Sequence, residues 1–112
     1  MDVLIEIRDG VLVARAEGRI DAYNSPEFES ALRSAIEECE GPAVIDCSDL
    51  SYISSAGMRT ILMIAQILEE REVKLAVCCL IEEIAELFRI SGFDKIIDTY
   101  PTVQQALAAV TD

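Results

Sequence analysis

The sequence predicts an α/β domain in which a β-hairpin is followed by alternating strands and helices. Residues 43–47 and 73–79 are short apolar runs of the kind that form interior strands of a sheet. Apolar residues at helical spacing fill the segments between these runs and after them. This alternation favours parallel strands in one sheet, because each crossover between parallel strands is right-handed and needs a helix to cover the sheet.

The chain opens with the hairpin, and a helix follows. Residues 3–8 and 11–17 alternate imperfectly around Asp9-Gly10, a dipeptide that fits a tight type I′ turn. Asn24-Ser25-Pro26 supplies a cap and a proline suited to the first helical turn, so a helix is predicted to start there and to end before Gly41-Pro42. Its apolar stripe must pack on the sheet and comprises Phe28, Ala31, Leu32, Ala35 and Ile36.

A second helix is predicted over residues 55–70. If the sheet covers one apolar stripe of this helix, three further apolar side chains need cover elsewhere. The stripe is Met58, Ile61, Leu62, Ala65 and Leu68, and the three others are Met63, Ile64 and Ile67. Contact with a partner protein and packing against a neighbouring helix explain these three about equally well.

Three shorter elements complete the predicted fold. A helix is expected over residues 80–90, with Gly92 as its left-handed terminator. A short strand is expected at Ile96 and Ile97. The last helix is expected over residues 102–110, where the run from Thr102 to Gln105 fits a capping box.

Length and composition indicate one domain that spans residues 1–112, because 52% hydrophobic content can furnish a core at this length. The chain has no uninterrupted apolar run of about 18 residues. Its N-terminus carries an acid where a signal peptide would carry positive charge. We therefore expect a cytoplasmic protein.

The charge balance narrows the choice of partners. With 21 acidic and 9 basic side chains, the net charge of −12 would repel a nucleic-acid backbone and an anionic membrane surface. A protein with a basic face would be attracted, although the charge can equally serve solubility alone. The chain has no histidine, so Ser-His-Asp triads, Cys-His pairs and His-containing metal sites are excluded and hydrolytic enzymes are disfavoured.

The cysteine spacing matches neither a small disulfide scaffold nor a metal knuckle. We expect Cys39, Cys47, Cys78 and Cys79 to be reduced and mostly buried. The sequence also lacks a glycine-rich phosphate loop. No cofactor and no metal are predicted.

The junction between the strand at 43–47 and the helix at 55–70 is the most informative stretch. It places Ser54 and Ser55 where the helix begins. A phosphate there would meet unpaired backbone N–H groups and the positive end of the helix macrodipole, so the fold would tolerate it. A serine before a helix is most often only an N-cap, and helix physics leaves both roles open.

The same stretch resembles the signature of the STAS domain of bacterial anti-sigma factor antagonists. It reads Asp46-Cys-Ser-Asp-Leu-Ser-Tyr-Ile-Ser-Ser-Ala-Gly57 and ends in a small-residue turn into a helix. Two other segments resemble family segments in the same order, Gly18-Arg19-Ile20-Asp21 before a helix and the run from Phe88 to Ile97 after the penultimate helix. The resemblance implies the STAS fold, a mixed β-sheet of about five strands with the N-terminal hairpin, packed by about four α-helices.

The resemblance also implies a function. By position in the motif, the phosphoserine of the family falls on Ser55. The implied protein is an anti-sigma factor antagonist and not an enzyme. Its unphosphorylated form binds an anti-sigma factor that is also its serine kinase, and a serine phosphatase restores it. Ser54 stands where the sporulation-type pattern has Asp, and Ala56 stands where that pattern often has Ser or Thr.

Several residues around this serine are candidates for contact with the kinase or anti-sigma factor. Asp21 matches a loop acid of the family that could hydrogen-bond the Ser55 hydroxyl or a basic kinase side chain, although the sequence alone favours an ordinary acid in a turn at a strand end. Gly57 would permit close approach of another backbone, or would give the helix start a small residue. The candidate partner-binding residues are Asp21, Ser54, Ser55, Ala56, Gly57, Met58 and Arg59.

Two other functions remain open from the sequence. Asp46 at a strand end could belong to a phospho-accepting receiver, but a receiver needs an acidic pair after its first strand and a lysine after its last. Here the first strand ends in a hairpin, and Lys95 precedes its strand. STAS domains also occur as modules attached to anion transporters, so regulation of a transporter or another partner is the second alternative.

Overall fold

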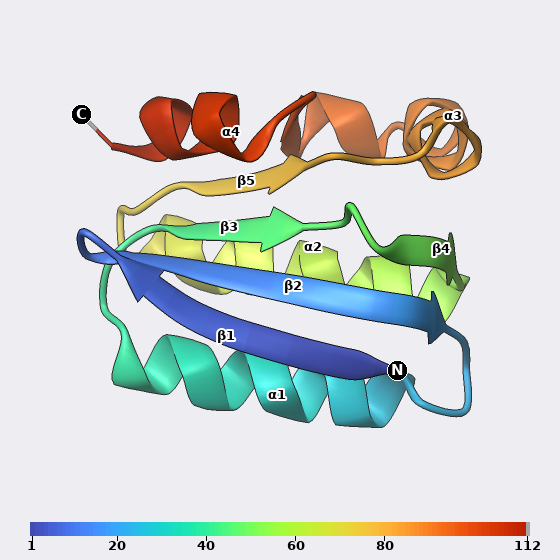
Figure 1. Ribbon diagram of the computed structural model, residues 1–112, viewed down its shortest axis with the longest axis horizontal. Coiled ribbons are helices and arrows are strands. Elements are labelled where there is room, and N and C mark those ends of the chain that lie inside the picture. The colour runs from blue at the N-terminus through green and yellow to red at the C-terminus, as the bar shows by residue number, and fades with distance from the viewer. Residues whose placement is uncertain (112) are drawn as a thin grey trace.

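The computed structural model describes residues 1–111 and shows a mixed β-sheet with helices on both faces (Figure 1). Within this part of the chain the sheet has six strands in the order β1-β2-β3-β5-β6, and β4 pairs with β2 outside that path. The strands are β1 (Asp2–Arg8), β2 (Val11–Ile20), β3 (Ala43–Asp46), β4 (Leu50–Ile53), β5 (Leu75–Cys78) and β6 (Asp98–Tyr100). The helices are α1 (Ser25–Glu38), α2 (Ser55–Glu70), α3 (Glu82–Ser91) and α4 (Val103–Val110).

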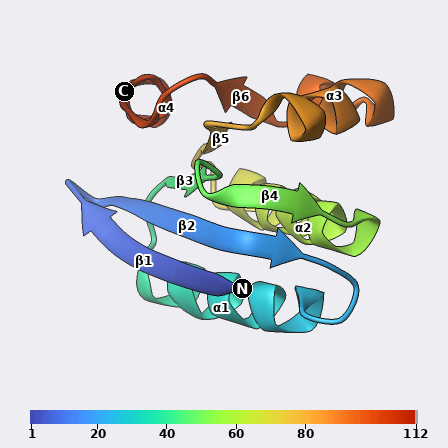
Figure 2. The ribbon, with the colours of Figure 1, turned by 45° about the vertical axis from the view of Figure 1, so that its right-hand side comes forward.

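Strand β2 organises the sheet because it is long enough to pair with two parallel strands in turn. Its first half pairs with β3, in a register that opposes Leu12 to Ala43. Its second half pairs with β4 and opposes Ile20 to Ile53. Figure 2 shows β4 running beside the carboxyl end of β2, so the loop that follows β2 and the helix that follows β4 start next to each other.

Alternation along β2 divides the core into two layers. Leu12, Ala14 and Ala16 belong to the larger layer, where they pack with side chains of α1, α2 and α3. Val11 and Val13 point to the other face and belong to the layer under α4. Figure 1 shows α4 on the side of the sheet away from α1 and α2. The predicted α/β class and the mixed sheet with four helices are therefore confirmed.

The local signals that depend on backbone conformation are confirmed. Asp9 and Gly10 both have positive φ, 50° and 81°, as a type I′ turn requires. Gly92 ends α3 in the left-handed conformation with φ 82°. The Thr102 hydroxyl accepts a hydrogen bond from the backbone N–H of Gln105 at 3.1 Å and so caps α4.

Two sequence predictions were wrong in position. The strand expected at residues 96–97 lies at β6 instead, because a 3-10 turn (Phe93–Lys95) intervenes and the N–H of Ile97 bonds back to the Phe93 carbonyl. The helix expected from residue 80 begins at Glu82, since Ile81 has the extended backbone of an N-cap. Asn24 is the N-cap residue of α1, as predicted, but its side chain makes no capping hydrogen bond.

The orientation of α2 also differs from the prediction. Gly57, Thr60, Ile61, Ile64 and Leu68 are buried, together with Met58. Ile64 is thus a core residue covered within the fold, whereas Leu62 and Ala65 are only half-buried. Met63 and Ile67 are half-buried and pack against the same core. Packing within the domain is the correct explanation for Ile64, because α1 lies beside α2 on this face of the sheet.

Candidate functional site

The candidate site lies where β4 passes into α2, and Ser54 is the residue that caps this helix. The Ser54 hydroxyl oxygen accepts a hydrogen bond from the backbone N–H of Gly57 at 3.2 Å. Its own N–H donates to the carbonyl of Ile20 at 2.8 Å, and its carbonyl accepts from the N–H of Met58 at 2.9 Å. Ser54 therefore joins the end of β2 to the first turn of α2 and is committed to the fold.

Ser55 is the first residue of α2 and is exposed. Among residues 1–111 its hydroxyl has no hydrogen-bond partner. Because Ser54 holds the cap, the Ser55 hydroxyl is free to react without loss of a structural contact. It also lies at the end of the helix where backbone N–H groups and the macrodipole favour an anion.

Asp21 holds the neighbouring loop closed. Its Oδ1 accepts hydrogen bonds from the backbone N–H groups of Tyr23 and Asn24, each at 2.9 Å. Asn24 reciprocates, since its Oδ1 accepts from the Asp21 N–H at 2.9 Å and its side-chain amide donates to the Arg19 carbonyl. Within the described part of the chain, the carboxylate of Asp21 makes no hydrogen bond to Ser55. The contacts seen at Asp21 are those of an acid that stabilises a turn at the end of a strand.

Two of the candidate residues are buried under the site. A Cβ on Gly57 would lie 2.7 Å from Cγ2 of Ile20 and 2.8 Å from Cγ1 of Ile53, so only glycine fits where the helix meets the ends of β2 and β4. The side chain of Met58 is 7% exposed and belongs to the larger core layer. Neither residue offers a side chain to a partner, and both set the position of Ser55 from below.

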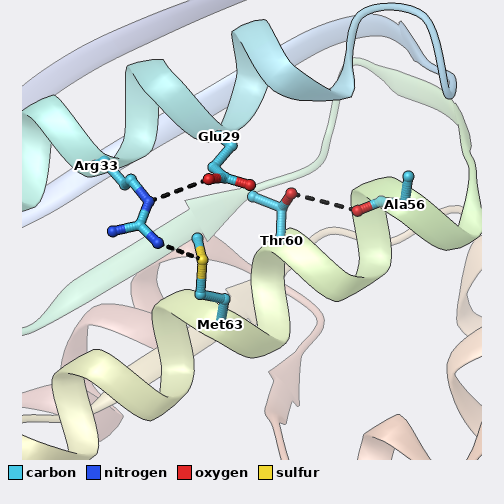
Figure 3. Close-up of polar contacts among 5 residues, drawn as sticks. All are labelled: Glu29, Arg33, Ala56, Thr60 and Met63. Atoms are coloured by element: carbon cyan, nitrogen blue, oxygen red, sulfur yellow. Dashed lines mark hydrogen bonds and ion pairs between the residues drawn. The ribbon is translucent and has the colours of Figure 1, made fainter.

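A shallow groove between α1 and α2 borders the site. Ala56, Arg59 and Met63 line it from α2, and Pro26 and Glu29 line it from α1. Of the polar contacts drawn in Figure 3, the one between Arg33 and Met63 joins the two helices. Arg33 pairs with Glu29 at 3.1 Å and donates from Nη2 to the Met63 sulfur at 2.8 Å. The Thr60 hydroxyl donates to the Ala56 carbonyl at 3.3 Å.

Two aromatic residues near the site were missed from the sequence. Arg19 lies over the ring of Tyr52, 4.4 Å from its centroid, across the pairing of β2 with β4. Tyr23 in the Asp21 loop is 95% exposed. The only sequence signal for these two residues was an aromatic side chain among polar, solvent-facing neighbours. A search for apolar periodicity does not find such a residue.

The four cysteines are free, as expected. Cys39, Cys47 and Cys78 are buried, and Cys79 is half-buried. Burial raises the pKa of the Cys47 thiol to about 12, and burial also raises the pKa of Cys78 and of Cys79. Protonated, enclosed thiols of this kind are poor nucleophiles.

Comparison with known proteins agrees with this geometry. The model of the STAS domain family matches residues 2–106, a range that includes Ser54, Ser55 and the whole sheet. The chain belongs to the STAS domain family. A protein of Bordetella bronchiseptica named anti-sigma factor antagonist BtrV is 33% identical over 109 residues, which cover 97% of this chain and 94% of that protein.

Solved structures of the family have the same fold as this STAS domain. The crystal structure of an anti-sigma factor antagonist from Mycobacterium paratuberculosis superposes with a TM-score of 0.90 at 28% identity, covering 99% of this chain and 94% of that chain. The phosphorylated form of SpoIIAA, a cell fate determinant of Bacillus, superposes with a TM-score of 0.74 at 18% identity, covering 98% of this chain and 100% of that chain. Among residues 1–111, no helix is both long and apolar enough to span a membrane.

Proposed function

We propose that this STAS domain is an anti-sigma factor antagonist and that phosphorylation of Ser55 controls its binding to an anti-sigma factor. The relatives named above as anti-sigma factor antagonists support the first part. The observation that carries the second part is the division of roles between two serines. Ser54 caps α2, and Ser55 is exposed with a hydroxyl that the fold does not use.

A phosphate on Ser55 changes charge at a place where the fold can hold it. Phosphorylation adds about 1.5 to 2 negative charges and three strong acceptor oxygens. At the first position of α2 these meet the positive end of the macrodipole. Arg59 is exposed and lies four residues further on, so its guanidinium can reach the same face of the helix. The modified protein therefore stays folded.

The phosphate affects the binding of a partner more strongly than it affects the fold. A protein that covers the start of α2 must bury a dianion or draw back from it. A loss of about 3 kcal/mol in binding free energy already weakens an affinity more than a hundredfold. Phosphorylation thus switches affinity and leaves the shape of the domain unchanged.

The partner surface consists of exposed and half-buried groups around Ser55. These are Ala56 and Arg59 at the groove between α1 and α2, and the loop that Asp21 closes. A net charge of −12 favours an anti-sigma factor whose docking face is basic. In this proposal the anti-sigma factor is also the serine kinase, a serine phosphatase reverses the modification, and this chain is their substrate.

The receiver alternative finds no support in the arrangement of the strands. A receiver collects its acids at the carboxyl end of a first, interior parallel strand. Here β1 is antiparallel to β2 and forms the edge of the sheet. Asp46 is buried and accepts a hydrogen bond from the Ser48 N–H. An aspartyl phosphate would lack the acidic pair that holds Mg²⁺ in such domains.

Phosphorylation in a lysate of the source cells with ATP, followed by site mapping with mass spectrometry, tests the proposal. We expect acid-stable phosphate on Ser55 in the wild type and none on Ser55→Ala. Ser51→Ala is the matched control, because Ser51 is also exposed and its hydroxyl donates to the Gly18 carbonyl outside the helix start. This control should be phosphorylated like the wild type. Phosphate that persists at another residue in Ser55→Ala, with Ser55 unmodified in the wild type, contradicts the proposal.

A further inference from the structure

A cluster of three metal-ligating side chains lies at the carboxyl ends of β3 and β5, and the proposed switch does not use it. The residues are Asp46, Cys78 and Cys79, and one ligand atom from each lies within 4.8 Å of those from the others. The parallel pairing of β3 with β5 places Asp46 directly opposite Cys78. Two thiols and a carboxylate from adjacent strands therefore face a common point.

An unusual backbone conformation brings the two adjacent cysteines together. Successive side chains of a strand point to opposite faces, so neighbouring cysteines should diverge. Cys79 has a positive φ of 63°, a left-handed conformation that L residues other than glycine rarely adopt. Its N–H donates to the Tyr100 carbonyl at 3.0 Å, which fixes this conformation. The turn redirects the Cys79 thiol toward Cys78 and Asp46.

Asp46 is held in place beside the two cysteines, and Arg8 and Arg15 line the same hollow as Asp46. It is 8% exposed, and its Oδ1 accepts a hydrogen bond from the Ser48 N–H at 3.0 Å. Among residues 1–111 it forms no ion pair within 4.0 Å. A buried carboxylate normally has a counter-charge or a metal ion. The carboxylate of Asp46 is hydrogen-bonded to the Cys79 side chain, so these two ligand groups already face each other.

We propose that Asp46, Cys78 and Cys79 bind a thiophilic divalent cation of the Zn²⁺ type. Cysteine sulfur and carboxylate oxygen are both zinc ligands, and two thiolates select such cations over Mg²⁺ or Ca²⁺. Bond lengths of about 2.3 Å to sulfur and about 2.0 to 2.2 Å to oxygen bring tetrahedral ligands within about 4 Å of one another. The three ligand atoms lie within 4.8 Å of one another, so they move closer together when the cation binds. Solvent supplies the fourth ligand.

The site is reachable, and its formation balances in charge and protons. Asp46 also lines an open hollow on the α4 face of the sheet, together with Glu6, Arg8, Val13 and Arg15. The cation replaces the protons of the two thiols, so one Zn²⁺ binds and two protons leave to solvent. The sequence predicted no metal because the ligands come from the ends of two strands that lie more than thirty residues apart in the chain.

Titration of the reduced, full-length protein with Co²⁺ and then Zn²⁺ tests this site. We expect one Co²⁺ per chain, with the visible absorption of tetrahedral cobalt and thiolate-to-cobalt charge transfer in the near ultraviolet. Zn²⁺ should abolish both bands and release two protons to a weakly buffered indicator. Binding of Zn²⁺ should also raise the melting temperature.

Variants separate this site from adventitious binding to the acidic surface. Cys79→Ser and Asp46→Asn should each weaken Zn²⁺ binding at least tenfold. Cys39→Ser is the control, because Cys39 is buried elsewhere and lies outside the cluster. It should bind like the wild type. Absence of the charge-transfer band, or affinity unchanged in Cys79→Ser and Asp46→Asn, overturns the proposal. Circular dichroism of each variant without metal shows whether it is folded. If Cys79→Ser does not fold, Asp46→Asn still tests the site, because it keeps both thiols and nearly the same shape.

Discussion

Two adjacent serines at the start of α2 have different physical roles. Ser54 is half-buried, and its hydroxyl holds the Gly57 N–H, while the neighbouring Ser55 is exposed. Ser54 can cap the helix permanently if it is never phosphorylated. Phosphorylation of Ser55 breaks no capping hydrogen bond, because Ser55 does not cap the helix. A phosphate can therefore come and go at Ser55 without touching the contact that starts the helix.

Stability measurements on the two alanine variants test this division. Ser54→Ala should lower the free energy of unfolding by about 1 kcal/mol, because it leaves a helix N–H without its cap. Ser55→Ala should change it by less than about 0.5 kcal/mol, as expected for an exposed side chain without partners. Urea denaturation monitored by circular dichroism measures both. Equal losses in the two variants would show that Ser55 shares the cap.

Gly57 gives a second prediction at the scale of single residues. Alanine is the better helix former by about 1 kcal/mol, yet its Cβ would lie 2.7 Å from a methyl group of Ile20. Gly57→Ala should therefore destabilise the domain by about 1 to 3 kcal/mol, since overpacking outweighs helix propensity. Thermal unfolding checks this. A stabilised Gly57→Ala variant would mean that α2 does not contact the ends of β2 and β4 as closely as described.

At the scale of elements, the burial of α2 decides which of its apolar residues hold the domain together. Ile64 is 1% exposed and packs in the larger core layer. Leu62 is half-buried and lines a surface hollow between α2 and the chain that precedes β6. The sequence prediction assigned these two residues to the opposite faces.

Truncation of each residue tests the orientation found. Ile64→Ala should lower the free energy of unfolding by about 2 to 5 kcal/mol, as expected when truncation of a large aliphatic core residue leaves a cavity. Leu62→Ala should cost about 1 kcal/mol, because the surface around it is already open. Denaturation midpoints at unchanged m-values measure the difference. A larger loss for Leu62→Ala would restore the orientation predicted from the sequence.

Elements with a strong local signal could be predicted, and those fixed by distant pairing could not. Asp9-Gly10 specifies its turn through backbone conformation, and Gly92 ends α3 for the same reason. Strand β4 has buried residues at both ends and exposed residues between them, so it lacks the alternation that marks a strand. It exists because β2 extends past β3 and offers a second partner. Likewise, the buried face of α2 depends on its contact with α1, and the apolar spacing within residues 55–70 carries no information about that contact.

The candidate site shows the same limit. The sequence pattern predicted that a helix starts at Ser54 and Ser55. It could not show which serine caps the helix and which has a free hydroxyl, because the two residues are both serines and both positions suit either role. The resemblance to the STAS domain pointed to Ser55, and the hydrogen bond of Ser54 explains why that choice leaves the fold intact. The groove beside it joins Glu29 and Pro26 to Arg59 and Met63 from two helices, so only the folded chain brings it together.

At the scale of the whole molecule, the net charge of −12 should control the approach of a partner. Electrostatic steering toward a basic anti-sigma factor predicts an association rate that falls at least about tenfold between low and high salt. The dissociation rate should change much less, because it depends on contacts at the surface around Ser55. Surface plasmon resonance at a series of ionic strengths measures both rates. An association rate that salt does not change would argue against a basic docking face.

The affinity of the purified anti-sigma factor for this chain, with and without phosphate on Ser55, is the most direct measurement of the switch. We predict tight binding of the unmodified chain and of Ser55→Ala. We predict an affinity at least about a hundredfold lower for the phosphorylated chain, whose circular dichroism spectrum should match that of the unmodified one. Equal affinity of the phosphorylated and unmodified forms, or a phosphorylated form that is unfolded, would contradict the account.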